Sequence, residues 1–339
     1  MGVRNTILNI EGLKVHFDTL DGTSRVLDGV ELSVREGEVV GLVGETGCGK
    51  SITAKTILRS LPMPPGRIIE GEILFLGDNL LELSREEGHQ VMSKKMSYIP
   101  QDPMTSLNPV FSVGEEMGDL IRWHGRRRLG PLELMGLRRR HDNSIAKAVE
   151  LLDRVKIPAP REIIGRYPVE LSGGMRQRVL IAMALIGYSS LLIADEPTTA
   201  LDVTIQKGIL ELIEEKVKEE ELSVLYITHN LGVARRLCDR IYVMYAGTIA
   251  ETAKTQDLLD NPKHPYTSGL ISSIPKLTGD EFKGIDGRIP DYIDPPSGCR
   301  FHPRCPEVME ICEQEKPELV KVGGGRLVAC HLFSTGGES

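Results

Sequence analysis

The segment 44–51 has glycine, lysine and serine at the spacing of a phosphate-binding loop. It matches G-x-x-x-x-G-K-[ST] at every fixed position, with the residues Gly44, Glu45, Thr46, Gly47, Cys48, Gly49, Lys50 and Ser51. Such glycines let successive N–H groups face the phosphates, while Lys50 would reach the β/γ-phosphates and Ser51 would hold Mg²⁺. An apolar run precedes the loop and a helix-like stretch follows it, which argues against a chance match in a glycine-rich turn. We therefore predict binding of a nucleoside triphosphate.

Two further segments carry chemistry of the same kind. Leu191 to Ala194 is an apolar run that ends in Asp195 and Glu196. A buried strand with an acid at its C-terminal end suits a parallel sheet that binds nucleotide at its strand ends. Ser172–Gly174 opens a long amphipathic helix, and a helix N-terminus is a ready-made anion site.

In chain order, these motifs resemble those of the ATP-binding cassette (ABC) ATPases. The series is the phosphate loop, Gln101, Ser172 to Gly174, Asp195 with Glu196, Asp202 and His229. The resemblance implies an α/β fold with a parallel core sheet around the phosphate loop, an antiparallel β subdomain and a helical signature subdomain. We expect the cassette to occupy residues 1–260 and the helical subdomain about 102–186.

The resemblance also implies roles for single residues. Glu196 would be the general base, supported by His229 and Gln101. Mg²⁺ would be held by Ser51, Gln101 and Asp195, and Phe17 would stack on the adenine, although the family more often has tyrosine there. Ser172, Gly173 and Gly174 would complete the nucleotide site of an opposing subunit, which Asp202 would contact.

Composition narrows the functional classes. The 339 residues carry a net charge of −7, which argues against a broad nucleic-acid-binding face. No apolar run approaches the ~20 residues that span a bilayer, and the N-terminus reads as a strand and not as a signal peptide. We expect a peripheral protein on the cytoplasmic face of the cell membrane, with reduced cysteines.

An arginine-rich segment at about 124–142 looks like an insertion in the helical subdomain. Arg126 to Arg128 and Arg138 to Arg140 flank an apolar stretch. A solvated face is one interpretation of such a cluster. Contact with anionic lipid headgroups or with a permease is the other.

Residues 261–339 differ in character and resemble the C-terminal extension of oligopeptide/dipeptide importer ATPases. The matching segments are 101–109, 264–270 and 298–306. The resemblance implies a related but different second ATPase subunit, two transmembrane permease subunits and an extracytoplasmic solute-binding protein. Oligosaccharides or nickel are alternative solutes, and a soluble ABC ATPase acting on ribosomes or DNA is a more distant alternative.

Four cysteines lie in this small Cys-rich extension, namely Cys299, Cys305, Cys312 and Cys330. Four thiolates suit a tetrahedral site for zinc or an iron–sulfur cluster, although the C-x₂-C pairs of zinc ribbons are missing. Because some members of the resembling family carry a [4Fe–4S] cluster, we favour it over Zn²⁺. We expect the cluster to support the fold, to take no part in hydrolysis, and to have its charge partly offset by Arg300 and Arg304.

Overall fold

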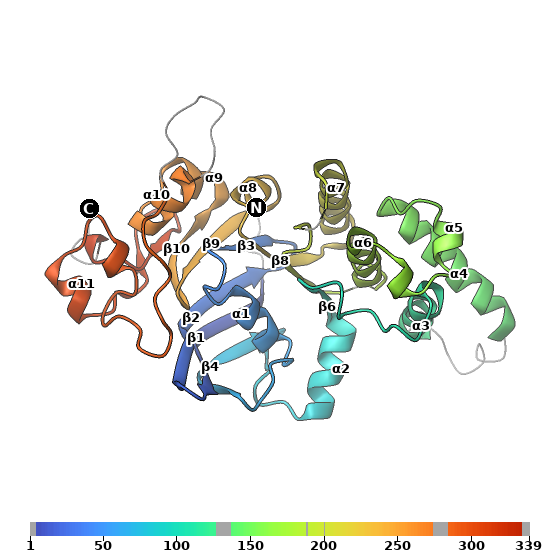
Figure 1. The fold of residues 1–339 in the computed structure, drawn as a ribbon, viewed down its shortest axis with the longest axis horizontal. Coiled ribbons are helices and arrows are strands. Elements are labelled where there is room, and N and C mark those ends of the chain that lie inside the picture. The colour runs from blue at the N-terminus through green and yellow to red at the C-terminus, as the bar shows by residue number, and fades with distance from the viewer. Residues whose placement is uncertain (1–4, 127–136, 188, 200, 274–283, 334–339) are drawn as a thin grey trace. The chain divides into compact units, whose positions relative to one another are not determined.

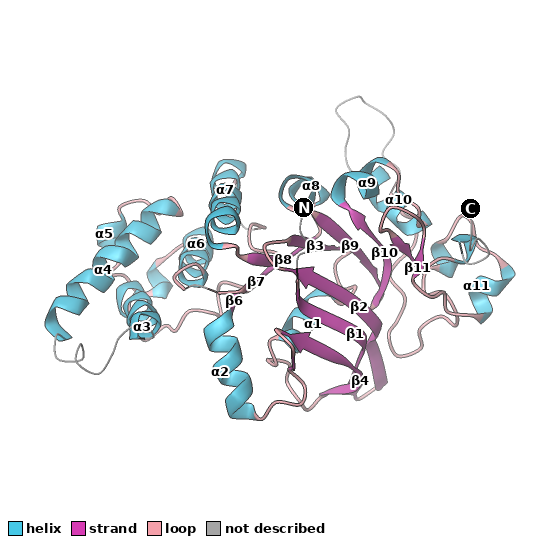
Figure 2. Cartoon of the chain, turned by 180° about the vertical axis from the view of Figure 1, so that it is seen from behind, coloured by secondary structure: helices cyan, strands magenta, loops and turns pink. Residues whose placement is uncertain are grey.

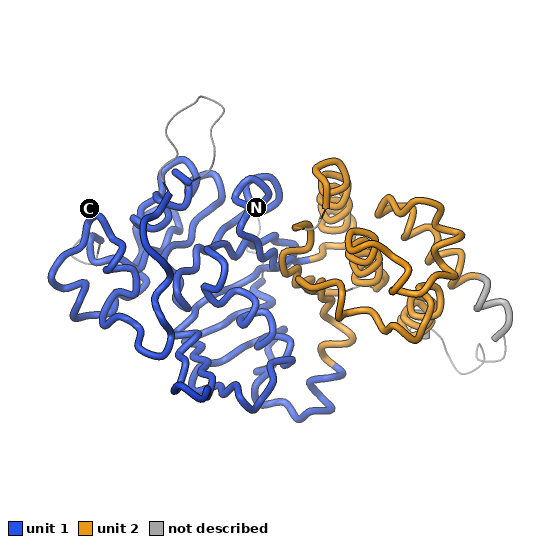
Figure 3. The backbone as a smooth tube through the Cα atoms, viewed as in Figure 1, with its two compact units in different colours: residues 1–90, 223–339 blue, residues 91–222 orange. Residues whose placement is uncertain are grey.

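The structure is a computed structural model that describes residues 5–126, 137–187, 189–199, 201–273 and 284–333 (Figure 1). It divides into two compact units (Figure 3): residues 1–90 and 223–339 form unit 1, and residues 91–222 form unit 2. Helix α2 (Arg85–Lys95) runs from the first into the second. Each unit is described by itself.

Unit 1 contains an antiparallel sheet near the N-terminus. Its strand order is β2-β1-β4-β5, with bounds β1 Thr6–Thr19, β2 Gly22–Arg35, β4 Gly66–Phe75 and β5 Asp78–Asn79. Figure 2 shows β1, β2 and β4 lying side by side. Apolar side chains of β1, such as Leu8, Ile10 and Val15, are fully or almost fully buried, while many of their neighbours are partly exposed. That near-alternation is typical of a sheet with one covered face.

The second group of strands in unit 1 supports the phosphate loop. Strands β11-β12-β10-β9-β3-β8 follow one another across it: β3 Val39–Val43, β8 Ser223–Thr228, β9 Arg240–Tyr245, β10 Thr248–Lys254, β11 Val320–Lys321 and β12 Leu327–Val328. Strand β3 is parallel to both β8 and β9. Every residue of β3 and β8 is buried, as expected for parallel strands covered on both faces.

The described helices of unit 1 are short. They are α1 Lys50–Ile57, α8 Leu231–Leu237, α9 Thr255–Asp260, α10 Pro265–Ser272 and α11 Glu310–Gln314. Strands β9 and β10 form a hairpin whose two turn residues, Ala246 and Gly247, both have positive φ. A Cβ on Gly247 would lie 1.9 Å from the Val26 carbonyl oxygen, so only glycine fits there.

Unit 2 is mostly helical. Its helices are α3 Val113–Arg126, α4 Leu137–Arg154, α5 Pro160–Ile163, α6 Gly173–Ala184 and α7 Val203–Glu220. A parallel pair of strands, β6 Met96–Ile99 and β7 Leu191–Asp195, completes it. Residues 127–136 of the predicted arginine-rich insertion lie outside the described residues.

The C-terminal extension clusters with residues 1–90 in unit 1. Its strand β12 pairs with β10, and the fully buried Glu251 of β10 accepts backbone hydrogen bonds from Lys263 and His264. Arg326 lies 3.4 Å from the same carboxylate. The expected α/β fold is confirmed, and the extension adds strands to the edge of its core sheet.

Candidate nucleotide-binding site

The phosphate loop joins β3 to α1, as its motif predicted. A Cβ on Gly44 would lie 2.2 Å from the Met244 carbonyl oxygen, and Gly49 has φ 111°. Both positions therefore require glycine. Helix α1 begins at Lys50 with Gly49 as its N-cap and without a capping side chain, so its positive end opens toward the loop.

Lys50 is folded back onto this loop. Its side chain is buried, and its ammonium donates to the carbonyl oxygens of Gly44 and Glu45 at 2.9 Å each. The Cys48 thiol lies 3.8 Å from the same nitrogen. Burial raises the pKa of Cys48 despite the nearby Lys50, so this cysteine is a neutral packing residue.

His229 follows β8 and is exposed at its end. Because Val43 of β3 pairs with Thr228 of β8, the phosphate loop and His229 lie at the same edge of the parallel strands. Phe17 lies near the end of β1, half-buried, opposite Ser24 and Gly66. Unit 1 thus presents the loop and His229 together.

In unit 2, the acidic pair lies at the tip of β7. Asp195 is 1% exposed and Glu196 is 8% exposed. Burial, followed by the negative charge of Asp195, raises the pKa of Tyr98 to about 12. Gln101 is exposed just after β6, and the pairing of Ile99 with Ala194 places it at the same edge as the acids.

Glu196 has an unusual backbone conformation. Its φ is 47°, in the left-handed region that a non-glycine residue adopts only at a cost of about 1–3 kcal/mol. The Thr199 hydroxyl donates to its carboxylate at 3.3 Å. Strain of this kind concentrates at functional sites, because the surrounding structure must hold the side chain in one direction.

The signature segment forms the start of α6. The Ser172 hydroxyl oxygen accepts a hydrogen bond from the Met175 amide at 3.3 Å, which makes Ser172 the N-cap. Gly173 is exposed, and a Cβ there would meet no atom within 4 Å. The N-terminus of α6 is therefore an open surface.

Asp202 has a role that the motif did not reveal. It is the N-cap of α7, and its carboxylate accepts a hydrogen bond from the Ile205 amide at 3.0 Å. An aspartate ahead of a helical pattern is a recognised capping signal. A role in a dimer contact would come in addition to this one.

Of the four cysteines of the extension, Cys312 and Cys330 are buried and Cys299 and Cys305 are partly exposed. They lie close enough to interact: burial, with the other three thiols adding to it, raises the pKa of Cys299 to about 11. Among the residues that the structure describes, however, no group of three or more His, Cys, Asp or Glu side chains is arranged to hold a metal ion. The expected [4Fe–4S] or zinc site is therefore not supported.

The two arginines beside these cysteines bind other groups. Arg304 pairs with Glu45 of the phosphate loop, 2.8 Å away, and Arg300 lies 3.6 Å from Asp28. That they partly offset the charge of a cluster stays a prediction. Sequence reasoning missed the contact between Arg304 and Glu45, which no motif or spacing signals.

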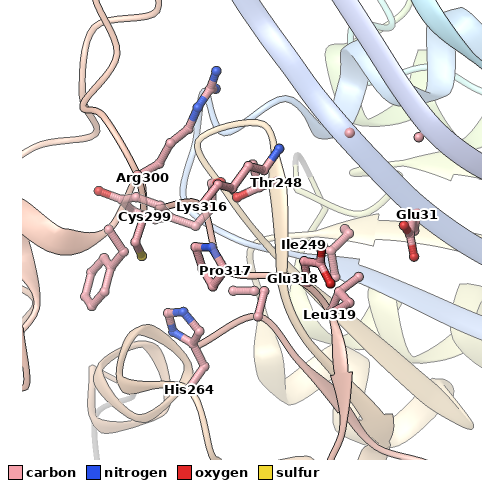
Figure 4. Close-up of a pocket in the computed structure, with 17 residues that line it drawn as sticks. Glu31, Thr248, Ile249, His264, Cys299, Arg300, Lys316, Pro317, Glu318 and Leu319 are labelled. Carbon is pink, nitrogen blue, oxygen red and sulfur yellow. The ribbon is translucent and has the colours of Figure 1, made fainter. Parts of the chain in front are cut away.

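A cavity of about 590 Å³ in unit 1 is lined by none of the phosphate-loop residues. Figure 4 shows lining residues from β2 (Glu31), from β10 (Thr248, Ile249) and from the extension, including Arg300 and Lys316. Lys316 is hydrogen-bonded to Asp28 at 3.0 Å, beside Arg300. The single carboxylate of Asp28 offsets part of the charge of these two cations. Glu31 and Glu318 add two further negative charges to the lining, so the cavity offers little attraction for an anion.

Comparisons with known proteins agree with the motif order. Residues 27–199 match the family described as "ABC transporter", and residues 250–312 match "Oligopeptide/dipeptide transporter, C-terminal region". The chain is 43% identical to a probable peptide ABC transporter ATP-binding protein of Sinorhizobium fredii and 42% identical to the dipeptide transport ATP-binding protein DppD of Bacillus subtilis. Both matches cover 96% of this chain and 94% of the relative.

Solved structures show the same fold. The dimeric ATP-binding cassette MJ0796 bound to ADP and Pi aligns with a TM-score of 0.63 at 24% identity, over 73% of this chain and 98% of that one. The cbiO1 protein of Clostridium perfringens aligns with a TM-score of 0.58 at 26% identity, over 76% and 92%. Within the described part of the chain, no helix combines the length and apolar character needed to cross a bilayer.

Proposed function

Because this chain belongs to the ABC transporter family of ATPases, we propose that it is the ATP-hydrolysing subunit of an importer for oligopeptides or dipeptides. The observation that carries the ATPase part is the phosphate loop, with Lys50 buried against its carbonyls at the head of α1. The match of residues 250–312 to the oligopeptide/dipeptide region, together with relatives named for peptide transport, supports the solute class.

Within unit 1, the loop would bind the phosphates. Residues Gly44 to Ser51 supply backbone N–H groups, Lys50 supplies a positive charge, and Phe17 would stack on the base. His229, at the same strand edge, would contact the γ-phosphate. To reach the phosphates, the Lys50 ammonium would exchange carbonyl oxygens for phosphate oxygens.

Within unit 2, the edge after β6 and β7 would supply the catalytic groups. Glu196 would accept a proton from the attacking water, and its constrained backbone would hold the carboxylate in one direction. Gln101 and Asp195 of this unit, with Ser51 of the phosphate loop in unit 1, would hold Mg²⁺, which supplies positive charge to the phosphate oxygens. Oxygen donors of this kind are what Mg²⁺ prefers.

The open start of α6 would serve a second ATPase subunit. Ser172, Gly173 and Gly174 would face the nucleotide of that subunit, and Asp202 would contact it. We propose a related but different ATPase as this partner. The complete importer would add two permease subunits and an extracytoplasmic solute-binding protein, with this chain at the cytoplasmic face of the membrane.

An uptake experiment tests the solute class. Cells lacking this chain should lose ATP-dependent uptake of a labelled tripeptide, and the intact chain should restore it. A Lys50→Ala chain should not restore it, whereas Lys55→Ala, at an exposed lysine on α1, should do so. If cells lacking this chain lose uptake of nickel or an oligosaccharide but take up the tripeptide normally, the transported solute is not a peptide.

We propose a metal site at the four cysteines of the extension, and the presence of four thiol ligands is its only support. Four thiols that interact electrostatically could close around a [4Fe–4S] cluster, or Zn²⁺ as the alternative, if deprotonated. Iron and zinc content of anaerobically purified protein would decide between them. Cys305→Ser should lower the metal content of the protein, and Cys238→Ser should not. Wild-type protein that contains neither iron nor zinc would refute the proposed site.

A further inference from the structure

The phosphate loop is bound from the C-terminal extension at Glu45. The Arg304 guanidinium donates to both carboxylate oxygens of Glu45, at 2.8 and 3.1 Å. This bidentate geometry is the strongest form of ion pair between two side chains. The Arg304 side chain is 6% exposed and the Glu45 side chain 28% exposed, so the pair is partly shielded from solvent.

Other contacts hold Arg304 in this position. Its remaining donors bind the carbonyl oxygens of Ile285 and Asp286 at 3.2 and 2.8 Å, and its guanidinium lies 5.6 Å from the ring centre of Tyr245. The pair with Glu45 raises the pKa of Arg304. The guanidinium is therefore a fixed positive charge against the loop.

Two tyrosines of the extension bind the loop backbone. The Tyr266 hydroxyl accepts a hydrogen bond from the Glu45 amide at 3.0 Å, and the Tyr292 hydroxyl donates to the Gly47 carbonyl oxygen at 2.7 Å. The extension thus contacts the loop at three groups: the Glu45 side chain, the Glu45 amide and the Gly47 carbonyl. Contacts this numerous would fix the path of the loop between Gly44 and Gly47.

Charge gives the ion pair a consequence for ligand binding. A carboxylate within a phosphate-binding loop repels the negative phosphates of a nucleoside triphosphate. Arg304 offsets that charge and fixes the carboxylate in a bidentate pair. Without Arg304, Glu45 would be a partly buried, uncompensated anion beside the phosphates.

We propose that Arg304 is a positioning residue for the nucleotide site, which acts through Glu45 by neutralising its charge and fixing the phosphate loop. This inference rests on the proposed binding of ATP to that loop. It gives the extension a part in nucleotide binding through Arg304, which is separate from the expectation that the cluster itself takes no part in hydrolysis.

The test measures equilibrium binding of a fluorescent ATP analogue, mant-ATP, to the purified full chain. Arg304→Gln should weaken binding at least about fivefold, the lower end of typical coupling between two sites. Adding Glu45→Gln to that variant should restore binding, because the repelling charge is then gone. Arg288→Gln, at an exposed arginine of the extension, is the matched control and should bind normally.

The outcomes separate the explanations. Normal binding by Arg304→Gln, or failure of Glu45→Gln to restore it, overturns the inference, since a merely structural role would not be relieved by removing the charge. If Arg304→Gln does not fold, Glu45→Gln alone decides: it should bind mant-ATP at least as tightly as wild type, and weaker binding overturns the inference. If wild type itself does not bind mant-ATP while remaining folded, it is the proposed function that fails.

Discussion

The Lys50 ammonium donates a hydrogen bond to the carbonyl oxygen of Glu45 at 2.9 Å, while the carboxylate of the same Glu45 pairs with Arg304. Glu45 therefore connects Lys50 to Arg304 of the C-terminal extension, which lies 259 positions farther along the chain than Glu45. In the proposed function Lys50 would leave this carbonyl for a phosphate. The ion pair uses the carboxylate of Glu45 and not its carbonyl, so it does not depend on the bond to Lys50.

Lys50→Ala should weaken mant-ATP binding. Hydrogen bonds to a charged group contribute roughly 1.5–3 kcal/mol, which corresponds to about 10- to 150-fold in affinity. Lys55→Ala removes an exposed ammonium from the same helix and should change affinity little. Equal affinities for wild type and Lys50→Ala in a binding titration would contradict the role of Lys50.

Glu196→Gln should preserve ATP binding and lower turnover by about 10²–10⁴-fold, the usual contribution of a general base. The amide has nearly the same size and cannot accept the proton, so the chain should keep its fold. Phosphate release by the assembled transporter is the measurement. Glu219→Gln, at an exposed position on α7, should retain normal turnover, and normal turnover by Glu196→Gln would rule out the assignment.

The purified chain alone should be a weak ATPase, and Gly173→Glu should abolish activity in the assembled transporter. A Cβ at Gly173 would meet no atom within 4 Å, and an acid in the first turn of α6 suits the helix dipole, so stability should be retained. The new carboxylate would instead repel the nucleotide of the opposing subunit.

Thermal unfolding and phosphate release together check this prediction. Gly208→Glu on α7, another position where a Cβ meets no atom within 4 Å, is the matched control and should remain active. Full activity of Gly173→Glu, or full solute-stimulated activity of the isolated chain, would contradict a composite site.

His264 should make the stability of the chain depend on pH. Burial lowers the pKa of His264 from 6.5 to about 4, and its Nδ1 accepts a hydrogen bond from the Tyr266 amide as the N-cap of α10. Between these two values the unfolded chain binds a proton that the folded chain does not. The stabilisation is therefore complete above pH 6.5 and is lost as the pH falls toward 4, by about 1.4 kcal/mol per unit of pKa difference.

His264→Asn separates this titration from capping, because asparagine is also a good N-cap and does not ionise. Urea unfolding at about pH 7.5 and about pH 5 should show a smaller loss of stability for the variant than for wild type. Equal losses in the two proteins would assign the pH dependence to other groups.

Local patterns were sufficient to predict much of the fold. Strand β3, the phosphate loop and α1 follow from an apolar run, glycines and a helical stretch that are adjacent in sequence. The same holds for β7 with Asp195 and Glu196, and for α6 with Ser172. Each of these elements depends on backbone preferences and hydrogen bonds between residues that are close in sequence, so local sequence patterns predict it.

Contacts between residues that are far apart in sequence are decided by the tertiary structure. The pairing of Arg304 with Glu45, the hydrogen bond from Tyr292 to Gly47, and the addition of β12 to β10 join segments that have no shared pattern. The positions of charged residues along the chain do not predict which acid a buried arginine will pair with. The pairing is decided by which backbone segments pack together. The motifs of this chain determined that a nucleotide site would form, and the packing of the extension in unit 1 decided what holds its phosphate loop.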